Sequence, residues 1–229
     1  MVLACVFFLP APLFGQALPA ASASTPGAFV PSAHEKASIG EVAVPLAFAA
    51  ALLEDRHIDE IVRAHRSHQG DRLANALDPL GRAQYILPLL AGSYLVSLGA
   101  HRHDDAHSIL RIGIAYLAAD AVEAMLKPAV GRHRPDSTER PFLFHPFKND
   151  EQWHSFPSAH ATHAFALANA ISIETDSRWL HVALFSTAAL VAAQRIYVGA
   201  HWSSDVIASA FLAVDASRIA ERFARRRLH

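Results

Sequence analysis

A series of long apolar segments, without alternation between apolar and polar residues, constrains the fold of this chain more than any other feature. Apolar runs of this length are typical of buried or membrane-facing helices, whereas half-buried strands are shorter and alternate. We therefore expect an all-α protein, a helical bundle of about five to six core helices. The segments cover approximately residues 83–100, 109–126, 161–173, 179–198 and 206–214.

The same segments leave two surroundings open for this bundle. Hydrophobic residues make up 52% of the chain and charged residues 18%, which is more apolar than a typical soluble domain and favours membrane association. However, Arg111, Asp120 and Glu123 interrupt the second segment, and several segments are shorter than the roughly 20 residues that a membrane span needs. Both a membrane-embedded bundle and a soluble bundle agree with these lengths.

The N-terminus has the features of an export signal. Residues 2–14 are apolar, residues 17–24 are rich in small side chains, and Ala21-Ser22-Ala23 fits the A-x-A cleavage pattern. We therefore expect residues 1–23 to be a signal peptide, residues 24–40 a linker, and residues 41–229 one folded domain. Because no basic residue precedes the apolar run and Pro10 and Pro12 interrupt it, an N-terminal anchor is the alternative.

Charge and cysteine content exclude two classes of function. A formal net charge of -1 gives no global positive field, so we expect no nucleic-acid partner. The only cysteine, Cys5, lies within the predicted signal peptide, so the processed chain would have no thiol for catalysis or for a disulfide.

Residues 41–80 are expected to form shorter helices. The apolar run 41–53 is too short to cross a membrane as a helix and is expected to pack against protein. Residues 58–80 carry apolar side chains near helical spacing, with Gly70 between them. This pattern predicts two short amphipathic surface helices that are separated around Gly70.

Polar clusters lie at the ends of the apolar segments. In the first, Lys127 and Arg134 follow the end of a predicted helix, and two cations at one helix exit suggest an anion site. In the second, Ser158 immediately precedes the next helix and is a natural N-cap. The free N–H groups at such a helix start suit phosphate oxygens.

A third cluster joins Arg195 to His201 and Asp205. The last two are four residues apart and could share one face of a helical turn, where Asp205 would orient the imidazole. If successive helices alternate in direction, the helix ends that carry Lys127, His160, Arg195 and His201 lie on one side of the bundle. The arginine-rich C-terminal tail then lies on the other side, as a cytoplasmic end would, although an ordinary basic helix end explains that tail equally well.

Taken in order, the three clusters resemble the signature of the type 2 phosphatidic acid phosphatase (PAP2) and vanadium haloperoxidase superfamily. That signature reads K-x6-RP, then PSGH, then SR-x5-H-x3-D, and every spacing is met here. Ala159 stands where the family usually has glycine, and Gln194 stands where it usually has serine. Neither departure removes a reacting group, and the resemblance covers about residues 83–214.

The resemblance implies a PAP2-type helical bundle and a division of labour within it. His201 would attack phosphorus, Asp205 would hold its tautomer, and His160 would protonate the leaving oxygen. The phosphoryl oxygens would be held by Lys127, Arg134, Ser158, Ala159 and Arg195. No metal or other cofactor is implied, although vanadate could occupy the phosphate site.

The implied function is hydrolysis of a phosphomonoester or diphosphate, with a phosphorylated lipid such as phosphatidate or polyprenyl diphosphate as the expected partner. Phe142, Phe144, Trp153 and Phe156 would either form an apolar mouth for a lipid tail or close the insertion 136–155 over the core. We expect an exported, membrane-associated enzyme whose site faces the periplasm or cell exterior. A soluble periplasmic acid phosphatase, a vanadate-dependent haloperoxidase and a non-catalytic phospholipid-binding envelope protein are the alternatives.

The 15 histidines also suggest metal sites, which spacing has to support. The run 101–107 is rich in histidine and aspartate, but helix alternation places it opposite the three clusters, where a solvated loop is the preferred interpretation. His154, His160 and His163 form a second candidate set, in which a metal would occupy the nitrogen that His160 needs for proton transfer. We therefore predict no metal site, and packing or loop roles for His154 and His163.

Overall fold

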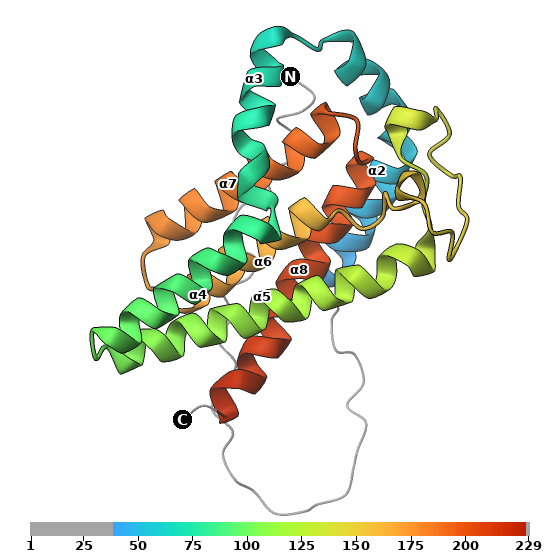
Figure 1. Ribbon diagram of the computed structural model, residues 1–229. Coiled ribbons are helices and arrows are strands. Elements are labelled where there is room, and N and C mark those ends of the chain that lie inside the picture. The colour runs from blue at the N-terminus through green and yellow to red at the C-terminus, as the bar shows by residue number, and fades with distance from the viewer. Residues whose placement is uncertain (1–38, 228–229) are drawn as a thin grey trace, which may run out of the picture. The chain divides into compact units, whose positions relative to one another are not determined.

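The computed structural model describes residues 39–227, and within this range the chain forms helices and no strand (Figure 1). The all-α prediction is therefore confirmed. The chain divides into two compact units, residues 1–47 and 48–229, and the account below concerns the second. The predicted signal peptide, and the predicted linker apart from residues 39 and 40, lie outside the described residues.

Each of the five apolar segments corresponds to one helix, and two further helices precede them. The helices are α2 (Ile39–Ala64), α3 (His68–Leu77), α4 (Ala83–Gly99), α5 (His103–Val130), α6 (Ala159–Ile173), α7 (Arg178–Tyr197) and α8 (Ser203–Arg227). Three short 3-10 turns, η2 (Asp78–Gly81), η3 (Pro135–Ser137) and η4 (Glu151–Trp153), lie in the connections. The insertion between α5 and α6 is otherwise irregular, as expected.

Helix α5 extends beyond the predicted apolar segment at both ends. Asp104 and Asp105 lie in its first turn, where carboxylates complement the positive end of the helix dipole. Gly131 ends the helix in the left-handed conformation, with φ 58°, a common helix stop. A side chain there would also collide with the backbone carbonyl of His145, so the helix end and the following insertion are packed backbone to backbone.

The prediction for residues 41–80 is wrong in two respects. Helix α2 continues to Ala64, and the break falls before Ser67, which caps α3 by accepting a hydrogen bond from Gly70 N. Gly70 lies inside α3, where its lack of a side chain makes room for the Tyr197 ring. The run 41–53 does not pack fully against protein either, because Leu53 is 80% exposed.

The core of the bundle is made of small side chains on α5, α6 and α8. Helix α6 lies against α5, α7 and α8, and Ala119, Ala166 and Ala213 meet where α5, α6 and α8 come together. A second alanine-rich cluster joins α6 to α7. Small residues let helix backbones approach closely, so the polar ends of these helices also come close together.

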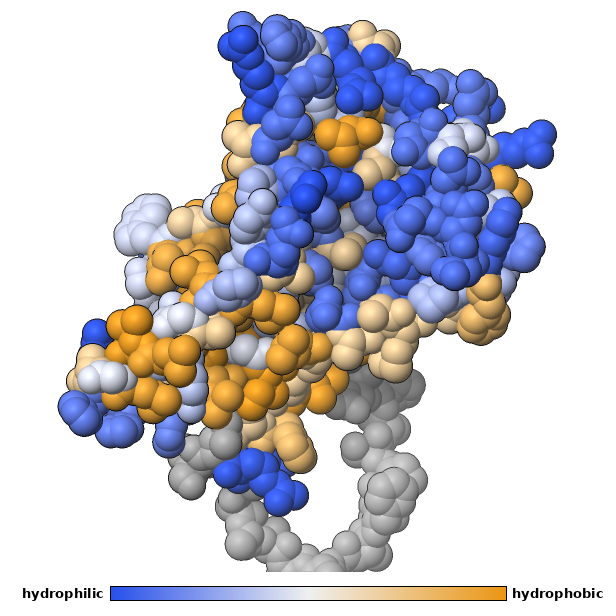
Figure 2. Space-filling model, viewed as in Figure 1, coloured by the Kyte–Doolittle hydropathy of each residue, from blue (hydrophilic) through white to orange (hydrophobic). Residues whose placement is uncertain are grey.

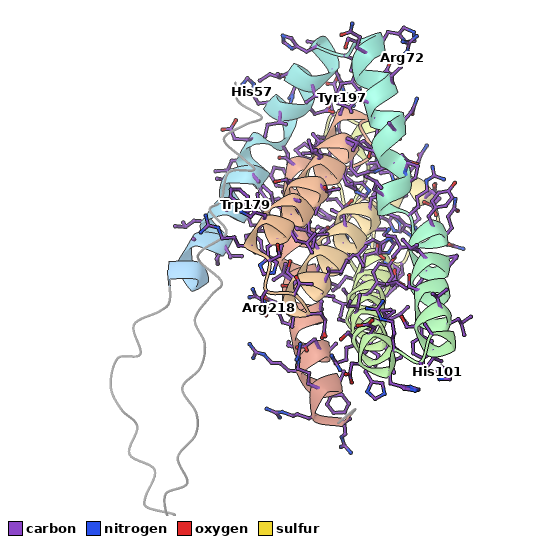
Figure 3. The ribbon with its side chains drawn as sticks, turned by 90° about the vertical axis from the view of Figure 1, so that its left-hand side faces the viewer. His57, Arg72, His101, Trp179, Tyr197 and Arg218 are labelled. Carbon is purple, nitrogen blue, oxygen red and sulfur yellow. The ribbon has the colours of Figure 1, made fainter. Side chains whose placement is uncertain are left out.

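Ion pairs at one end of the bundle show how the helices alternate in direction. Glu174, just after α6, accepts hydrogen bonds from Arg111 near the start of α5 (2.9 and 2.6 Å) and from Arg225 near the end of α8 (2.9 Å). Figure 3 shows His101 and Arg218 toward this end, and Tyr197, at the end of α7, toward the opposite one. The predicted alternation is therefore correct.

Hydrophobic and hydrophilic side chains are separated along the surface. Figure 2 shows an apolar region over α4 and α5, and a hydrophilic region over α3 and the insertion. Among the described residues, one helix, α7, is both long and apolar enough to cross a bilayer, a property that core helices share. The exposed apolar side chains of α4, α5, α7 and α8 include Leu89, Leu95, Val96, Leu117, Met125, Trp179, Leu190, Ile219 and Phe223.

Candidate active site

His201 lies in the short connection between α7 and α8, and its side chain is only 3% exposed. Its Nδ1 lies 2.5 Å from the backbone carbonyl oxygen of Ser155. Because a carbonyl only accepts hydrogen bonds, Nδ1 carries the proton in the neutral ring, and Nε2 keeps its lone pair. This arrangement fixes the tautomer that a nucleophilic Nε2 requires.

Asp205 contributes to this arrangement less directly than its spacing suggests. Its nearest oxygen is 3.9 Å from His201 Nδ1, beyond hydrogen-bonding distance. Asp205 Oδ2 instead accepts hydrogen bonds from the Ser155 hydroxyl (2.5 Å) and from Trp202 N (3.0 Å). The carboxylate therefore holds Ser155, whose carbonyl holds the imidazole. Ser155 had no predicted role, although it opens the second cluster.

His160 is the second residue of α6, and its Nε2 lies 3.2 Å from Asp78 Oδ1. Burial, followed by the positive charge of Arg195, lowers the pKa of His160 to about 4. The same Asp78 oxygen accepts from Arg195 Nη1 at 3.1 Å, and its other oxygen contacts Arg82 Nε at 2.5 Å. Asp78 thus lies between two predicted site residues, and sequence reasoning missed it.

Lys127, Arg134 and Arg195 surround His201 with positive charge. Burial lowers the pKa of His201 well below its usual value, and these three cations lower it further. The Nε atoms of Arg134 and Arg195 are buried and have no hydrogen-bond acceptor among the described residues. Buried donors usually have a partner, so two such donors beside a neutral histidine fit an anionic ligand.

Each of these cations also has a carboxylate beside it. Lys127 Nζ lies 2.5 Å from Glu123 Oε1, and Arg134 Nη2 donates to Glu151 Oε2 at 3.2 Å. Arg195 has Asp78, as described above. Each of the three cationic side chains is thus held in place by an ion pair.

Ser158 and Ala159 begin α6 at the predicted place. Ser158 is buried, and its hydroxyl oxygen accepts a hydrogen bond from Ala161 N, which confirms the predicted N-cap. Its backbone N–H donates to Ser209 Oγ on α8 at 2.7 Å. Ala159 is the first helical residue, where a backbone N–H has no partner within the helix.

Backbone hydrogen bonds join the segments that carry these side chains. Arg134 N donates to Gln152 O (2.8 Å), and Asp136 N donates to Gly199 O (3.0 Å). The indole Nε1 of Trp202 donates to His133 O at 2.8 Å. The structure therefore brings together three clusters that are far apart in the sequence.

Two other predictions concerned histidines outside this group. His163 is buried, with Nδ1 2.9 Å from Gly81 O and Nε2 2.6 Å from Asp120 Oδ1, so it has a packing role, as expected. The histidine-rich run 101–107 lies at the opposite end of the bundle. Within residues 39–227, no group of three or more His, Cys, Asp or Glu side chains comes together as metal ligands would.

The comparison with protein families decides where the chain belongs. The sequence profile of the PAP2 superfamily matches residues 108–227, more than half of the chain. The chain belongs to the PAP2 superfamily. The match begins within α5 and includes every predicted PAP2 site residue.

Curated relatives of this PAP2 protein match it over part of their length. A lipid A 1-phosphatase of Rhizobium johnstonii is 38% identical over 86 residues, which cover 37% of this chain and 34% of that protein. A lipid A 4'-phosphatase of Bacteroides thetaiotaomicron is 29% identical over 108 residues, 45% of this chain and 48% of that protein. The chain thus spans about a third to a half of the length of these relatives.

Solved structures show that the fold is also that of PAP2 proteins. LpxE of Aquifex aeolicus superposes with a TM-score of 0.58 at 22% identity, over 72% of this chain and 93% of that one. A transmembrane PAP2-type phosphatidylglycerolphosphate phosphatase of Bacillus subtilis superposes with a TM-score of 0.62 at 19% identity. The latter match covers 81% of this chain and 96% of that chain.

Proposed function

We propose that this PAP2 protein is a phosphatase that hydrolyses a phosphorylated lipid through a phosphohistidine on His201, without a metal ion. The observation that carries the proposal is the hydrogen bond from His201 Nδ1 to Ser155 O, because it leaves Nε2 unprotonated among three cations. The low pKa of His201 keeps the ring neutral, and therefore nucleophilic, at neutral pH.

In the first step, Nε2 of His201 attacks phosphorus while the bond from phosphorus to the leaving oxygen breaks. Lys127, Arg134 and Arg195 bind the phosphoryl oxygens, where charge is spread in the transition state. His160 gives its proton to the leaving oxygen. In the second step, a water molecule loses a proton to His160 and attacks phosphorus, the N–P bond breaks, and inorganic phosphate leaves.

The proton on His160 is taken up together with the substrate. In the free site, burial and Arg195 hold the pKa of His160 at about 4, so the ring is neutral at pH 7. A bound phosphate dianion adds negative charge beside the ring and offsets the field of Arg195, which raises that pKa. Substrate binding thus converts His160 into the acid that the first step needs.

The charges around the site favour a reaction without metal. Lys127, Arg134 and Arg195 surround His201, and Glu123, Glu151 and Asp78 beside them are already paired with these cations. A divalent cation would be repelled by the side chains that bind a phosphoryl group. The cations themselves supply the charge stabilisation that a metal would otherwise provide.

The surface supports a lipid substrate and a membrane location. The exposed apolar side chains of α4, α5, α7 and α8 form the kind of surface that contacts lipid, and the catalytic residues lie at a polar end of these helices. The relatives named as lipid A phosphatases support the same class of substrate. Exposed Arg222, Arg226 and Arg227 lie at the other end, and basic residues at a cytoplasmic end would support an orientation with the site on the exported side of the membrane.

Phosphate release from detergent-solubilised full-length protein tests this proposal. We expect turnover of lipid phosphates and diphosphates in mixed micelles to exceed that of a soluble aryl phosphate, and to stay within about twofold in excess chelator. Loss of activity with chelator, restored by a divalent cation, would contradict the metal-independent mechanism. A protein that stays in solution without detergent and hydrolyses only soluble esters would instead be an acid phosphatase. A protein that binds lipid phosphate without turnover would be a non-catalytic lipid-binding protein.

Gly81 offers a test of the role of His160. A Cβ atom at Gly81 would lie 2.7 Å from His160 Cδ2, so Gly81→Ala must displace the ring or the η2 turn. Because a misplacement of about 1 Å can cost about 10²-fold in rate, we expect kcat to fall between about 10- and 100-fold, most strongly for esters with poor leaving groups. Steady-state kinetics on a leaving-group series measures this effect.

Gly92→Ala is the matched control, because a Cβ at Gly92 meets no other atom within 4 Å. Its kcat should equal that of the unmodified protein. Equal losses on good and poor leaving groups in Gly81→Ala would show that the disturbed group is not the acid.

A further inference from the structure

Asp55, a buried carboxylate on α2, lies outside the part of the chain that matches the PAP2 profile. Its side chain is fully buried. Oδ1 accepts from the Ser203 hydroxyl (2.6 Å) and from Ser204 N (2.9 Å), while Oδ2 accepts from the Ser204 hydroxyl (2.6 Å). Asp55 therefore caps the start of α8, which begins two residues after His201.

Arg132 connects Asp55 to the other buried carboxylate, Asp205. The guanidinium is 1% exposed and donates to Asp55 Oδ2 from Nη2 (2.7 Å) and to Asp205 Oδ1 from Nη1 (2.5 Å). It also donates to Ser204 Oγ and to Pro141 O. Two carboxylates and one guanidinium leave this cluster with a formal charge of -1 when both carboxyl groups are ionised.

The cluster is linked to the imidazole of His201 by hydrogen bonds. Arg132 holds Asp205, Asp205 holds the hydroxyl of Ser155, and the carbonyl of Ser155 accepts from His201 Nδ1. When Nε2 forms a bond to phosphorus, the ring becomes cationic, and a nearby negative charge stabilises it. The position and the charge of the cluster therefore both bear on the nucleophile.

Helix α2 also contacts the segment that follows Arg134. Arg63 lies on α2 about two turns after Asp55. Its Nη2 donates to the backbone carbonyl oxygen of Pro135, and its Nε donates to Asp59 Oδ2 at 2.7 Å. Asp59 is itself 7% exposed. The same helix thus contacts both sides of the proposed phosphate site, next to a phosphate-binding arginine and next to the nucleophile.

We propose that Asp55 is a positioning residue for His201, which sets the orientation and electrostatic surroundings of the imidazole through Arg132, Asp205 and Ser155. The expected effect of Asp55 on the reaction rate rests on the proposed function. The claim that Asp55 orients the imidazole of His201 does not. A buried ion cluster that only stabilises the fold would lower the melting temperature and leave the kcat of the folded protein unchanged. The two roles therefore give different results.

The first test compares Asp55→Asn with the control Glu60→Gln on the same helix. Asp55→Asn keeps the shape and removes the charge, whereas Glu60 is 57% exposed and pairs with Arg56. We expect kcat of the folded Asn variant to fall by about 10²-fold, the loss that a small misplacement causes. KM and the inhibition constant of inorganic phosphate should stay within about twofold, because the phosphate-binding cations are untouched. The control should match the unmodified protein.

The second test does not depend on turnover. In protein labelled with ¹⁵N-histidine, the proton of His201 Nδ1, held by Ser155 O, should give a downfield signal that His201→Gln lacks. Asp55→Asn should shift or broaden this signal, and Glu60→Gln should not. Ser203→Ala removes a single hydrogen bond to Asp55 and should cause a smaller change in the same direction, which covers the case in which Asp55→Asn fails to fold.

The outcomes separate the two proposals. Unchanged kcat together with an unchanged histidine signal in folded Asp55→Asn and Ser203→Ala would overturn the positioning role. If the unmodified protein released no phosphate from any substrate, the proposed function would fail, while the histidine signal would still decide whether Asp55 orients the ring.

Discussion

Replacing His201 with alanine is expected to abolish phosphate release, with a fall in kcat on the order of 10⁴- to 10⁶-fold, as for the loss of a nucleophile in other enzymes. The ring that would form the bond to phosphorus is removed, whereas Lys127, Arg134 and Arg195 remain to bind phosphate. Rapid acid-free quenching with a ³²P-labelled substrate should show an acid-labile, alkali-stable phosphoryl label on the unmodified protein, and none on His201→Ala.

His107→Ala is a matched control, since His107 is an exposed histidine near the start of α5, at the opposite end of the bundle. It should retain full activity. Circular dichroism and thermal melting establish that His201→Ala is folded, and inorganic phosphate should still bind to it. Substantial turnover by folded His201→Ala would mean that another group attacks phosphorus.

Replacing Arg132 with methionine should have the largest effect on stability. Arg132 lies between Asp55 and Asp205, and all three side chains are at most 1% exposed. Removing the cation leaves two buried carboxylates without their shared partner, and breaking a buried pair in this way costs about 3–5 kcal/mol. We expect a loss of this size in the free energy of unfolding, measured by denaturant titration in detergent.

The loss should become smaller as the pH falls. Burial raises the pKa of Asp205 above its usual value, and protonation removes the charge that Arg132 had balanced, so the Arg132→Met variant should recover part of its stability at pH 5 relative to pH 8. Arg56→Met is the control, because the pair of Arg56 with Glu60 is exposed and such pairs contribute about 0–1 kcal/mol. If Arg132→Met and Arg56→Met lost equal amounts of the free energy of unfolding, the claim that Arg132 balances two buried carboxylates would be wrong.

The sequence predicted the helical bundle and its alternation because both depend on local patterns. Long apolar runs indicate helices, and short connections between α6, α7 and α8 force neighbouring helices to reverse direction. Four of the predicted site residues stand at helix ends, namely Lys127, His160, Arg195 and His201. The alternating direction of the helices is therefore enough to bring them to the same end of the bundle. The motif spacing supplied the rest of the site.

Contacts between distant parts of the chain could not be read in the same way. Asp55 and Asp78 are single carboxylates with no local pattern, and the site residues that they contact, Arg132 and Arg195, lie more than 70 residues away. The expected contact between His201 and Asp205 assumed that both lie on one helix. Helix α8 begins only at Ser203, so His201 stands in the preceding turn and the four-residue rule does not apply to it.

The misplaced break in the region 41–80 has a similar cause. Glycine costs only about 1 kcal/mol within a helix, and packing of the Tyr197 ring against Gly70 outweighs that local preference. The actual break uses Ser67, whose capping role becomes visible only when the start of α3 is known.

Each of Lys127, Arg134 and Arg195 has a carboxylate beside it, so in the proposed mechanism an incoming phosphoryl group would not meet bare positive charge. The phosphoryl group would have to replace Glu123, Glu151 or Asp78 as the counter-ion of a cation. Its gain in binding energy would then be the difference between its own attraction to that cation and the attraction of the carboxylate that it replaces. In the proposed mechanism the same exchange would weaken product binding, because these acidic side chains compete with inorganic phosphate for the three cations.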